Sequence, residues 1–147
     1  MKIMTTLLLV IAGASSMQTT ANPSVISQHR EQIATMELDS IPPWPEGTVI
    51  EGTNQHWQKE LHRGEVAVAI YESMPAVIDV SEPFPYDEFV VVLVGEVILT
   101  ELDGSAQTYK AGDSFTVPKG WRGTWDMPVK YRELIVVETG AWEASGE

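Results

Sequence analysis

The sequence contains no cysteine among its 147 residues, which excludes disulfide bridges, thiolate metal sites and a cysteine nucleophile. Basic residues are scarce as well. Nine lysines and arginines stand against 21 aspartates and glutamates, which gives a formal charge of −12. Nucleic acids and anionic membrane surfaces both attract basic patches. We therefore expect no nucleic-acid partner and, after removal of a signal peptide, no membrane association.

An apolar run long enough to span a bilayer is also missing. The run LLLVIAGA at residues 7–14 follows Lys2 and has the length of the apolar region of a secretory signal. Small residues then offer two cleavage sites, after Ala21 and after Ser16, of which we favour Ala21. The sequence thus predicts a signal peptide over residues 1–21 and a periplasmic or secreted protein. The alternative is an uncleaved N-terminal anchor.

The segment after the signal differs from the rest of the chain. Between Ser24 and Met36, apolar residues recur at three- and four-residue spacing, which predicts a short helix. The stretch IPPWPEG at residues 41–47 contains three prolines and so cannot be a helix or a central strand. We therefore predict that residues 22–47 form a helix and a proline-rich arm, which Trp44 anchors on the rest of the protein.

From residue 48 onward the pattern is typical of β-structure. Short alternating or apolar segments are separated by turn signals, of which Asp103-Gly104 is a strong hairpin signal. Many short strands with almost no helix indicate a sandwich or a barrel. We predict one all-β barrel over residues 48–140 and a polar, frayed tail over residues 141–147.

One segment inside this region departs from the β-pattern. Residues 51–61 are polar and irregular, and they are expected to form a surface loop. His56 lies in this segment and His62 follows it, with five residues between the two histidines. This spacing matches no common metal-binding pattern, so it gives neither histidine a ligand role by itself.

The strongest strand signal lies in EPFPYDEFVVVLVG, residues 82–95. Glu88 begins a run that is otherwise apolar and ends at Gly95. A lone acid at the head of such a strand is costly to bury without a partner, so it requires a structural or a functional reason. Both faces of the strand are apolar, so both must be covered. We predict that Glu88 points into the mouth of the barrel.

Two motifs in this region resemble those of the cupin superfamily, whose members are small jelly-roll barrels. Glu88 and Gly95 have the spacing of the last two residues of the first cupin motif. Gly112, Pro118 and Gly120, within AGDSFTVPKG, match the second motif without a gap. The resemblance implies a single cupin jelly-roll barrel, also called a double-stranded β-helix.

Three further segments resemble one branch of this superfamily. They are YESMPA (residues 71–76), YDEF (86–89) and GWRGTWDMPVKYRELIV (120–136). They are similar to the ureidoglycine aminohydrolase and ethanolamine-utilisation cupins, and that similarity raises the prospect of a hydrolase activity. The usual glycine of the branch is Ala76 here, and its usual basic pair is Arg132-Glu133. These departures bear on function more than on fold.

The metal ligands of the superfamily are not reproduced. When the resemblance is aligned, the two first-motif histidines fall at Glu82 and Phe84, and the second-motif histidine falls at Gly123. Only Glu88 remains of four ligands, and divalent transition metals require three or four. We therefore predict no bound metal and no cofactor. The alternative is a site in which Glu82 and Glu88 recruit one of the two histidines named above.

What remains in the predicted mouth is a carboxylate among aromatic side chains. Such a site suits a neutral polyhydroxy ligand or an amine, through stacking, hydrogen bonds and cation–π attraction. If Glu88 is desolvated, its pKa rises and it can serve as a general acid or base. The alternative is a Glu88 that only forms hydrogen bonds and closes the barrel. The predicted ligand-binding residues are Tyr71, Glu82, Phe84, Tyr86, Trp125 and Arg132.

Three functions are compatible with the sequence. The first is a metal-independent cupin that binds a small molecule. The second is a hydrolase, isomerase or lyase that uses Glu88 as its general acid or base, and the third is an interaction protein with a vestigial pocket. The outward side chains of Phe89, Val91 and Leu93 are apolar. They fit a homodimer contact unless the N-terminal arm covers them.

Overall fold

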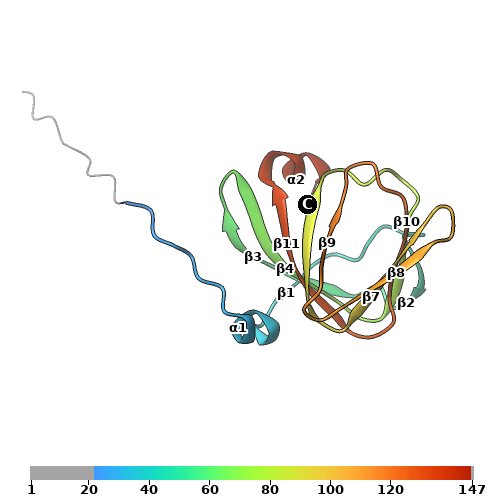
Figure 1. Cartoon of the computed structure of the whole chain (residues 1–147), viewed down its shortest axis with the longest axis horizontal. Helices are drawn as coiled ribbons and strands as arrows, with labels where there is room; N and C mark the ends of the chain where they lie inside the picture. The colour runs from blue at the N-terminus through green and yellow to red at the C-terminus, as the bar shows by residue number, and fades with distance from the viewer. Residues whose placement is uncertain (1–21, 147) are drawn as a thin grey trace, which may run out of the picture.

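Two antiparallel β-sheets form a jelly-roll barrel in the computed structural model, which describes residues 22–146 (Figure 1). The expected all-β barrel is therefore confirmed, whereas the predicted signal peptide at residues 1–21 lies outside the described residues. The first sheet contains, in spatial order, β1 (Asp39–Ser40), β3 (His56–Arg63), β4 (Val66–Ser73), β11 (Tyr131–Glu138), β6 (Glu88–Val94) and β9 (Ser114–Val117). The second sheet contains β2 (Val49–Gly52), β5 (Ala76–Val80), β10 (Gly123–Met127), β7 (Glu96–Glu101) and β8 (Ala106–Lys110).

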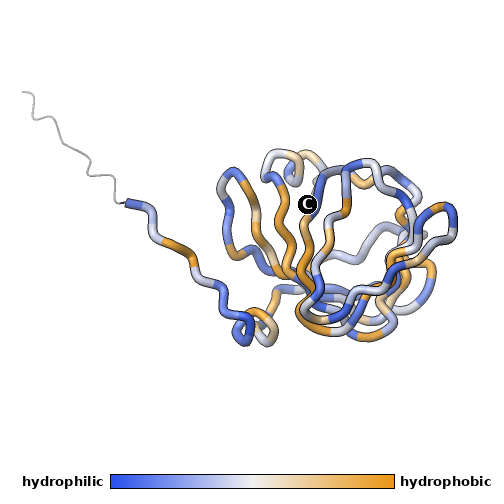
Figure 2. Tube along the Cα trace, viewed as in Figure 1, coloured by the Kyte–Doolittle hydropathy of each residue, from blue (hydrophilic) through white to orange (hydrophobic). Residues whose placement is uncertain are grey.

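The adjacent strands β11 and β6 lie inside the first sheet and carry apolar side chains on both faces. Figure 2 shows them among the hydrophobic stretches of the chain. Their register places Val90 opposite Ile135. These two side chains, together with Val92 and Val137, point into the core between the sheets. The outer face of the same strands therefore has to be covered by another element.

The short helix α1 (Arg30–Thr35) covers part of that outer face. Its buried Ile33 packs against Ile70 and Leu93, whereas Phe89 is 43% exposed. The helix is shorter than the predicted one, because the residues before position 30 are not helical. The sequence left two alternatives for this surface, a homodimer contact or cover by the N-terminal arm. The arm covers a part of it.

The segment predicted to be a surface loop is instead made of strands. Residues 51–61 contribute to β2 and β3, and β3 pairs with β4 along its length. The polar sequence is tolerated because β3 lies near the edge of its sheet, beyond which only the two-residue β1 follows. A bulge between Glu60 and His62 also interrupts its alternation. His56 is buried at the start of β3.

The C-terminal tail forms a helix, so the prediction of a frayed end is wrong. Residues 139–145 form α2 (Thr139–Ser145), and the Glu138 carboxylate caps its start by accepting hydrogen bonds from two backbone amides. Trp142 anchors the helix in the main core and is only 1% exposed. The guanidinium carbon of Arg63 lies 5.5 Å from the centre of the Trp142 ring, within cation–π range.

Both helices are short, with six and seven residues. Neither they nor any other stretch of residues 22–146 provides a helix with the length and apolar character needed to cross a membrane.

Replacing Trp142 by alanine is expected to lower the free energy of unfolding by about 3–5 kcal/mol, because the change removes a large buried side chain. Urea denaturation followed by circular dichroism measures this loss. Leu102→Ala is the control, since Leu102 is 77% exposed and such a surface change stays within about 0.5 kcal/mol. A loss below about 1 kcal/mol for Trp142→Ala would exclude α2 from the cooperative core.

Candidate functional site

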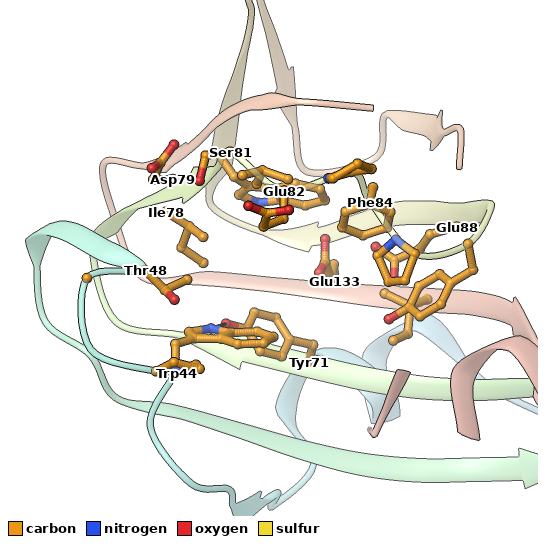
Figure 3. Close-up of a pocket in the computed structure, with 18 of the residues that line it drawn as sticks. Trp44, Thr48, Tyr71, Ile78, Asp79, Ser81, Glu82, Phe84, Glu88 and Glu133 are labelled. Carbon is orange, nitrogen blue, oxygen red and sulfur yellow. Dashed lines mark hydrogen bonds between the residues drawn. The ribbon is translucent and has the colours of Figure 1, made fainter. Parts of the chain in front are cut away.

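A cavity of about 570 Å³ opens between the two sheets at the mouth of the barrel (Figure 3). Its volume lies in the usual range for small-molecule sites. Among residues 22–146, no lysine, arginine or histidine lines it. The aromatic side chains that line it are Trp44, Tyr71, Phe84, Tyr86 and Trp125. The carboxyl side chains that line it are Glu46, Asp79, Glu82, Glu88 and Glu133.

The cavity collects almost all of the residues that the sequence predicted for the site. Glu88 and five of the predicted ligand-binding residues line it, and Arg132 does not. The segment from residue 81 to residue 87 is irregular, because β6 begins only at Glu88. Backbone hydrogen bonds hold this segment in place, and one of them runs from the Phe84 N–H to the Trp121 carbonyl. The predicted residues that line the cavity are Tyr71, Glu82, Phe84, Tyr86, Trp125 and Glu88.

Arg132 lies on the outer face of β11 and serves the fold instead of the cavity. Its Nε donates to Glu72 Oε2 at 2.8 Å, and its Nη1 donates to the carbonyl oxygens of Ile33 and Met36, both at 3.0 Å. It therefore binds the C-terminal end of α1 to the barrel. Burial acts to raise the pKa of Glu72, but hydrogen bonds and charges from Lys130 and Arg132 hold that pKa below its usual value.

Glu88 occupies the place that the sequence predicted, at the head of β6 and in the cavity wall. It is 5% exposed. Its backbone lies between Val117 of β9 and Val137 of β11, and it shares the inward parity of Val90. Its charge contributes to the raised pKa of Tyr131, so the carboxylate and the phenol lie within electrostatic reach of each other.

The most buried carboxyl group of the cavity is Glu133, which was not among the residues predicted for the site. It lies on β11 and is 4% exposed. The Tyr131 hydroxyl donates a hydrogen bond to its Oε2 at 2.5 Å. No side chain or backbone group of residues 22–146 donates a hydrogen bond to its other oxygen, Oε1. Burial raises the pKa of Glu133 to about 8, although the hydrogen bond from Tyr131 acts to lower it.

Tyr131 is a fixed hydrogen-bond donor to this carboxyl group. Burial, followed by the charges of Glu133 and Glu88, raises the pKa of the phenol far above its usual value. The phenol therefore keeps its proton at physiological pH. Glu133 can gain or lose a proton near neutrality, which is the property expected of a functional carboxyl group.

The sequence contains a signal that would have found Glu133. It stands directly before the apolar run at residues 134–137, just as Glu88 stands before its own apolar run. It also shares the parity of Ile135 and Val137, both of which face the core. Of the pair Arg132-Glu133, only the arginine was predicted to bind a ligand, although its parity is outward.

The proline-rich arm supplies one wall of the cavity through Trp44 (Figure 3). The Trp44 backbone N–H donates a hydrogen bond to Asn54 Oδ1 at 2.9 Å, and Asn54 Nδ2 donates one to the Trp44 carbonyl oxygen at 2.9 Å. Its indole N–H donates to the Tyr71 hydroxyl at 3.2 Å. His56 Nε2 donates to the Pro42 carbonyl at 2.8 Å, and the His56 ring meets the Trp44 ring edge-on. Trp44 is thus held in position before any ligand enters.

The side chains of the cavity do not fit the metal site that a cupin resemblance implies. Within the described part of the chain, no group of three or more His, Cys, Asp or Glu side chains is arranged to hold a metal ion. Gly123 stands where the resemblance places a histidine. A Cβ atom there would lie 2.1 Å from the Thr100 carbonyl oxygen and 2.7 Å from the Trp121 ring. The backbone of β10 would have to move before a histidine could occupy this position.

Comparison with known proteins agrees with the architecture. Residues 61–133 match the family model described as the EutQ-like cupin domain. This match, together with the observed barrel, assigns residues 61–133 to the cupin superfamily. A search among curated proteins gives no match to this cupin.

Solved structures show the same fold at low sequence identity. A Pseudomonas syringae protein of unknown function from the DUF861 family has a TM-score of 0.64 and 21% identity, and the match covers 71% of this cupin and 45% of that chain. A putative ethanolamine utilization protein Q from Salmonella typhimurium has a TM-score of 0.51 and 23% identity, with 71% and 98% covered. The polyketide cyclase RemF from Streptomyces resistomycificus has a TM-score of 0.55 and 15% identity, with 78% and 79% covered. At these identities the likeness establishes the fold alone, and this cupin spans less than half of the Pseudomonas chain.

The raised pKa of Glu133 predicts a dependence of stability on pH. Between about pH 4.5, where an unperturbed glutamate titrates, and about pH 8, the unfolded chain loses a proton that the folded chain retains. Stability should therefore fall as pH rises through this window, by about 1.4 kcal/mol per pH unit at most. Above pH 8 this loss is complete, and below pH 4.5 the stabilisation is fully present.

Urea denaturation of the wild type and of Glu133→Gln between pH 5 and pH 9 measures this effect. The glutamine can still accept the Tyr131 hydrogen bond but cannot titrate, so the difference in stability between the two proteins should change with pH. Glu65→Gln makes the same replacement of a carboxyl group by an amide at an exposed position outside the cavity, and its pH profile should track that of the wild type. Parallel pH profiles for the wild type and Glu133→Gln would contradict the raised pKa.

Proposed function

We propose that the protein is an exported cupin that binds a small neutral or amine-bearing molecule in the barrel mouth without a metal. The observation that carries this proposal is the lining of the cavity, which combines five aromatic and five carboxyl side chains with no basic side chain among the described residues. Aromatic rings stack on small organic ligands, and carboxyl groups accept hydrogen bonds from hydroxyl and amino groups. Phosphate and carboxylate ligands would meet repulsion instead.

The cavity also argues against a vestigial pocket. Phe84 and Trp125 are the side chains that would have to fill such a pocket, yet they line an open volume of about 570 Å³. Phe84 packs edge-on against Tyr86, with ring centres 5.3 Å apart, and Trp125 packs on Phe115 at 5.6 Å. Each ring is therefore held at the wall by a neighbour, which favours a preformed binding site.

A second candidate function is a metal-independent hydrolase, isomerase or lyase. The observation that favours it is Glu133, whose pKa of about 8 suits a general acid or base near neutral pH. Glu88, the acid first proposed for this role, would share it with Glu133. One structural neighbour, RemF, is a polyketide cyclase, so a protein of this fold can be a catalyst.

A direct parallel with ureidoglycine aminohydrolase is less well supported by the geometry. A glycine derivative carries a carboxylate, and a carboxylate substrate requires a cationic partner in a desolvated site. Arg132 was among the predicted ligand-binding residues, but its guanidinium is committed to Glu72 and to α1 outside the cavity. The proposal therefore keeps the cupin fold of that branch and sets aside its substrate.

A thermal-shift screen of neutral, amine and anionic small molecules tests the proposed function. A ligand at 100 times its Kd adds about 2.7 kcal/mol to stability, which raises Tm by several degrees. We expect neutral or amine compounds among the hits, and we expect Glu88→Gln to weaken them while Glu65→Gln does not. A set of hits made only of anions would contradict the proposal. Turnover of a hit by the wild type, abolished in Glu133→Gln, would identify an enzyme.

The metal-free reading predicts substoichiometric transition metal in the purified protein. Elemental analysis of protein prepared without chelators, before and after incubation with Mn, Fe, Ni and Zn salts, measures the content. The physical reason is the donor set, since a carboxylate pair without imidazole ligands competes poorly with water for these ions. One equivalent of a metal that survives dialysis and is lost in Glu88→Gln would contradict it.

A further inference from the structure

The ionisable side chains of the cavity are all acidic, both at its rim and deeper in its wall. Glu46 and Glu82 are exposed at its rim, and Glu88 and Glu133 are buried deeper in its wall. Arg132, the cation of β11, is paired with Glu72 on the other face of that strand. A positively charged ligand would therefore meet attraction at the entrance and again at the base.

The two walls of the cavity lie on either side of a buried carboxyl group. Figure 3 shows Glu133 between the wall that carries Trp44 and Tyr71 and the wall that carries Glu82 and Phe84. Only Oε2 of Glu133 receives a hydrogen bond among the described residues. Its other oxygen is available to a ligand held between the aromatic rings. Glu133, with one oxygen hydrogen-bonded and the other open to a ligand, is thus an observation separate from the acidic residues at the rim.

Aromatic rings and a carboxyl group together select for a particular chemistry. The faces of indole, phenol and phenyl rings attract cations, and the attraction is strongest where water is excluded. A neutral alcohol would make the same apolar contacts without this attraction. A hydrated metal ion would lack the alkyl groups that fill a cavity of about 570 Å³.

We propose that the ligand is an organic ammonium ion, whose charged group sits between the aromatic walls and against Glu133 and Glu88. This inference rests on the proposed function and makes it more specific, because it names the charge and the class of the ligand. The ammonium group contacts ring faces and carboxyl oxygens, and its alkyl part occupies the rest of the cavity. The rim carboxylates raise the local concentration of the cation.

Isothermal titration with matched pairs of probes tests the proposal. The cations are choline and n-pentylammonium, and their neutral counterparts are 3,3-dimethylbutan-1-ol and pentan-1-ol. Shape and apolar area are nearly the same within each pair, so the difference in affinity reports the charge. We expect at least one cation to bind about tenfold or more tightly than its counterpart, in keeping with cation–π and carboxylate attraction in a desolvated site.

Two variants locate the cation. Glu133→Gln keeps the hydrogen bond from Tyr131 and should weaken the cation about tenfold, while it leaves the neutral counterpart unchanged. Phe84→Leu keeps an apolar side chain but removes a ring face, so it should also weaken only the cation. Glu65→Gln is the control for net charge, because Glu65 is exposed and does not line the cavity. Circular dichroism of each variant tests whether it is folded.

The outcomes separate this inference from the proposed function. Equal affinity for a cation and its neutral counterpart would overturn the ammonium proposal and leave a small-molecule site in place. Binding of neither cation at millimolar concentration would overturn it as well. Cation binding that Glu65→Gln weakens as much as Glu133→Gln would overturn it too, because it would report surface charge instead of the cavity. Hits confined to anions would overturn both proposals.

Discussion

The central constraint on this structure is that the adjacent strands β6 and β11 must be buried on both faces. The inner face is covered by the second sheet, and this contact makes the barrel core. The outer face is covered in part by α1, which the Arg132 guanidinium holds through the carbonyl oxygens of Ile33 and Met36. The N-terminal arm then continues to Trp44, so the element that shields the sheet also builds a wall of the cavity. The N-terminal arm thus serves both to cover the sheet and to form the site.

The neighbouring residues Arg132 and Glu133 show two ways to bury an ionisable side chain. Arg132 is paired, because the buried Glu72 carboxylate lies beside its guanidinium. Glu133 has no cationic partner among the described residues, and burial raises its pKa to about 8. A buried charge without a counter-ion is expensive, so the group favours its neutral form instead. Because adjacent residues of β11 point to opposite faces of the sheet, Arg132 forms a structural ion pair outside the cavity and Glu133 faces into it, where it can respond to a ligand.

Much of the fold could be predicted from the sequence, because the cupin motifs contain glycines and turn residues at the spacing that the strands of a jelly roll require. The head of β6 was predictable for the same reason, and with it the place of Glu88. The strand β3 was not, because a bulged strand next to the edge of a sheet need not alternate. The helix α2 was missed because a single buried side chain, Trp142, holds it. The role of Arg132 depended on contacts with α1, and such long-range contacts leave no local pattern.

The chemistry of Glu133 suggests why a carboxyl group is found at the base of this cavity where a glutamine would also fill the space. An amide would accept the same hydrogen bond from Tyr131, but it could not acquire charge. A carboxyl group with a pKa of about 8 is largely neutral in the empty cavity, so burial imposes little of the cost of an unpaired anion at neutral pH. A cation between the aromatic walls would favour its ionised form, and the charge would then appear only when a counter-ion is present. On the proposed function, this coupling favours ammonium ions over neutral molecules of the same shape.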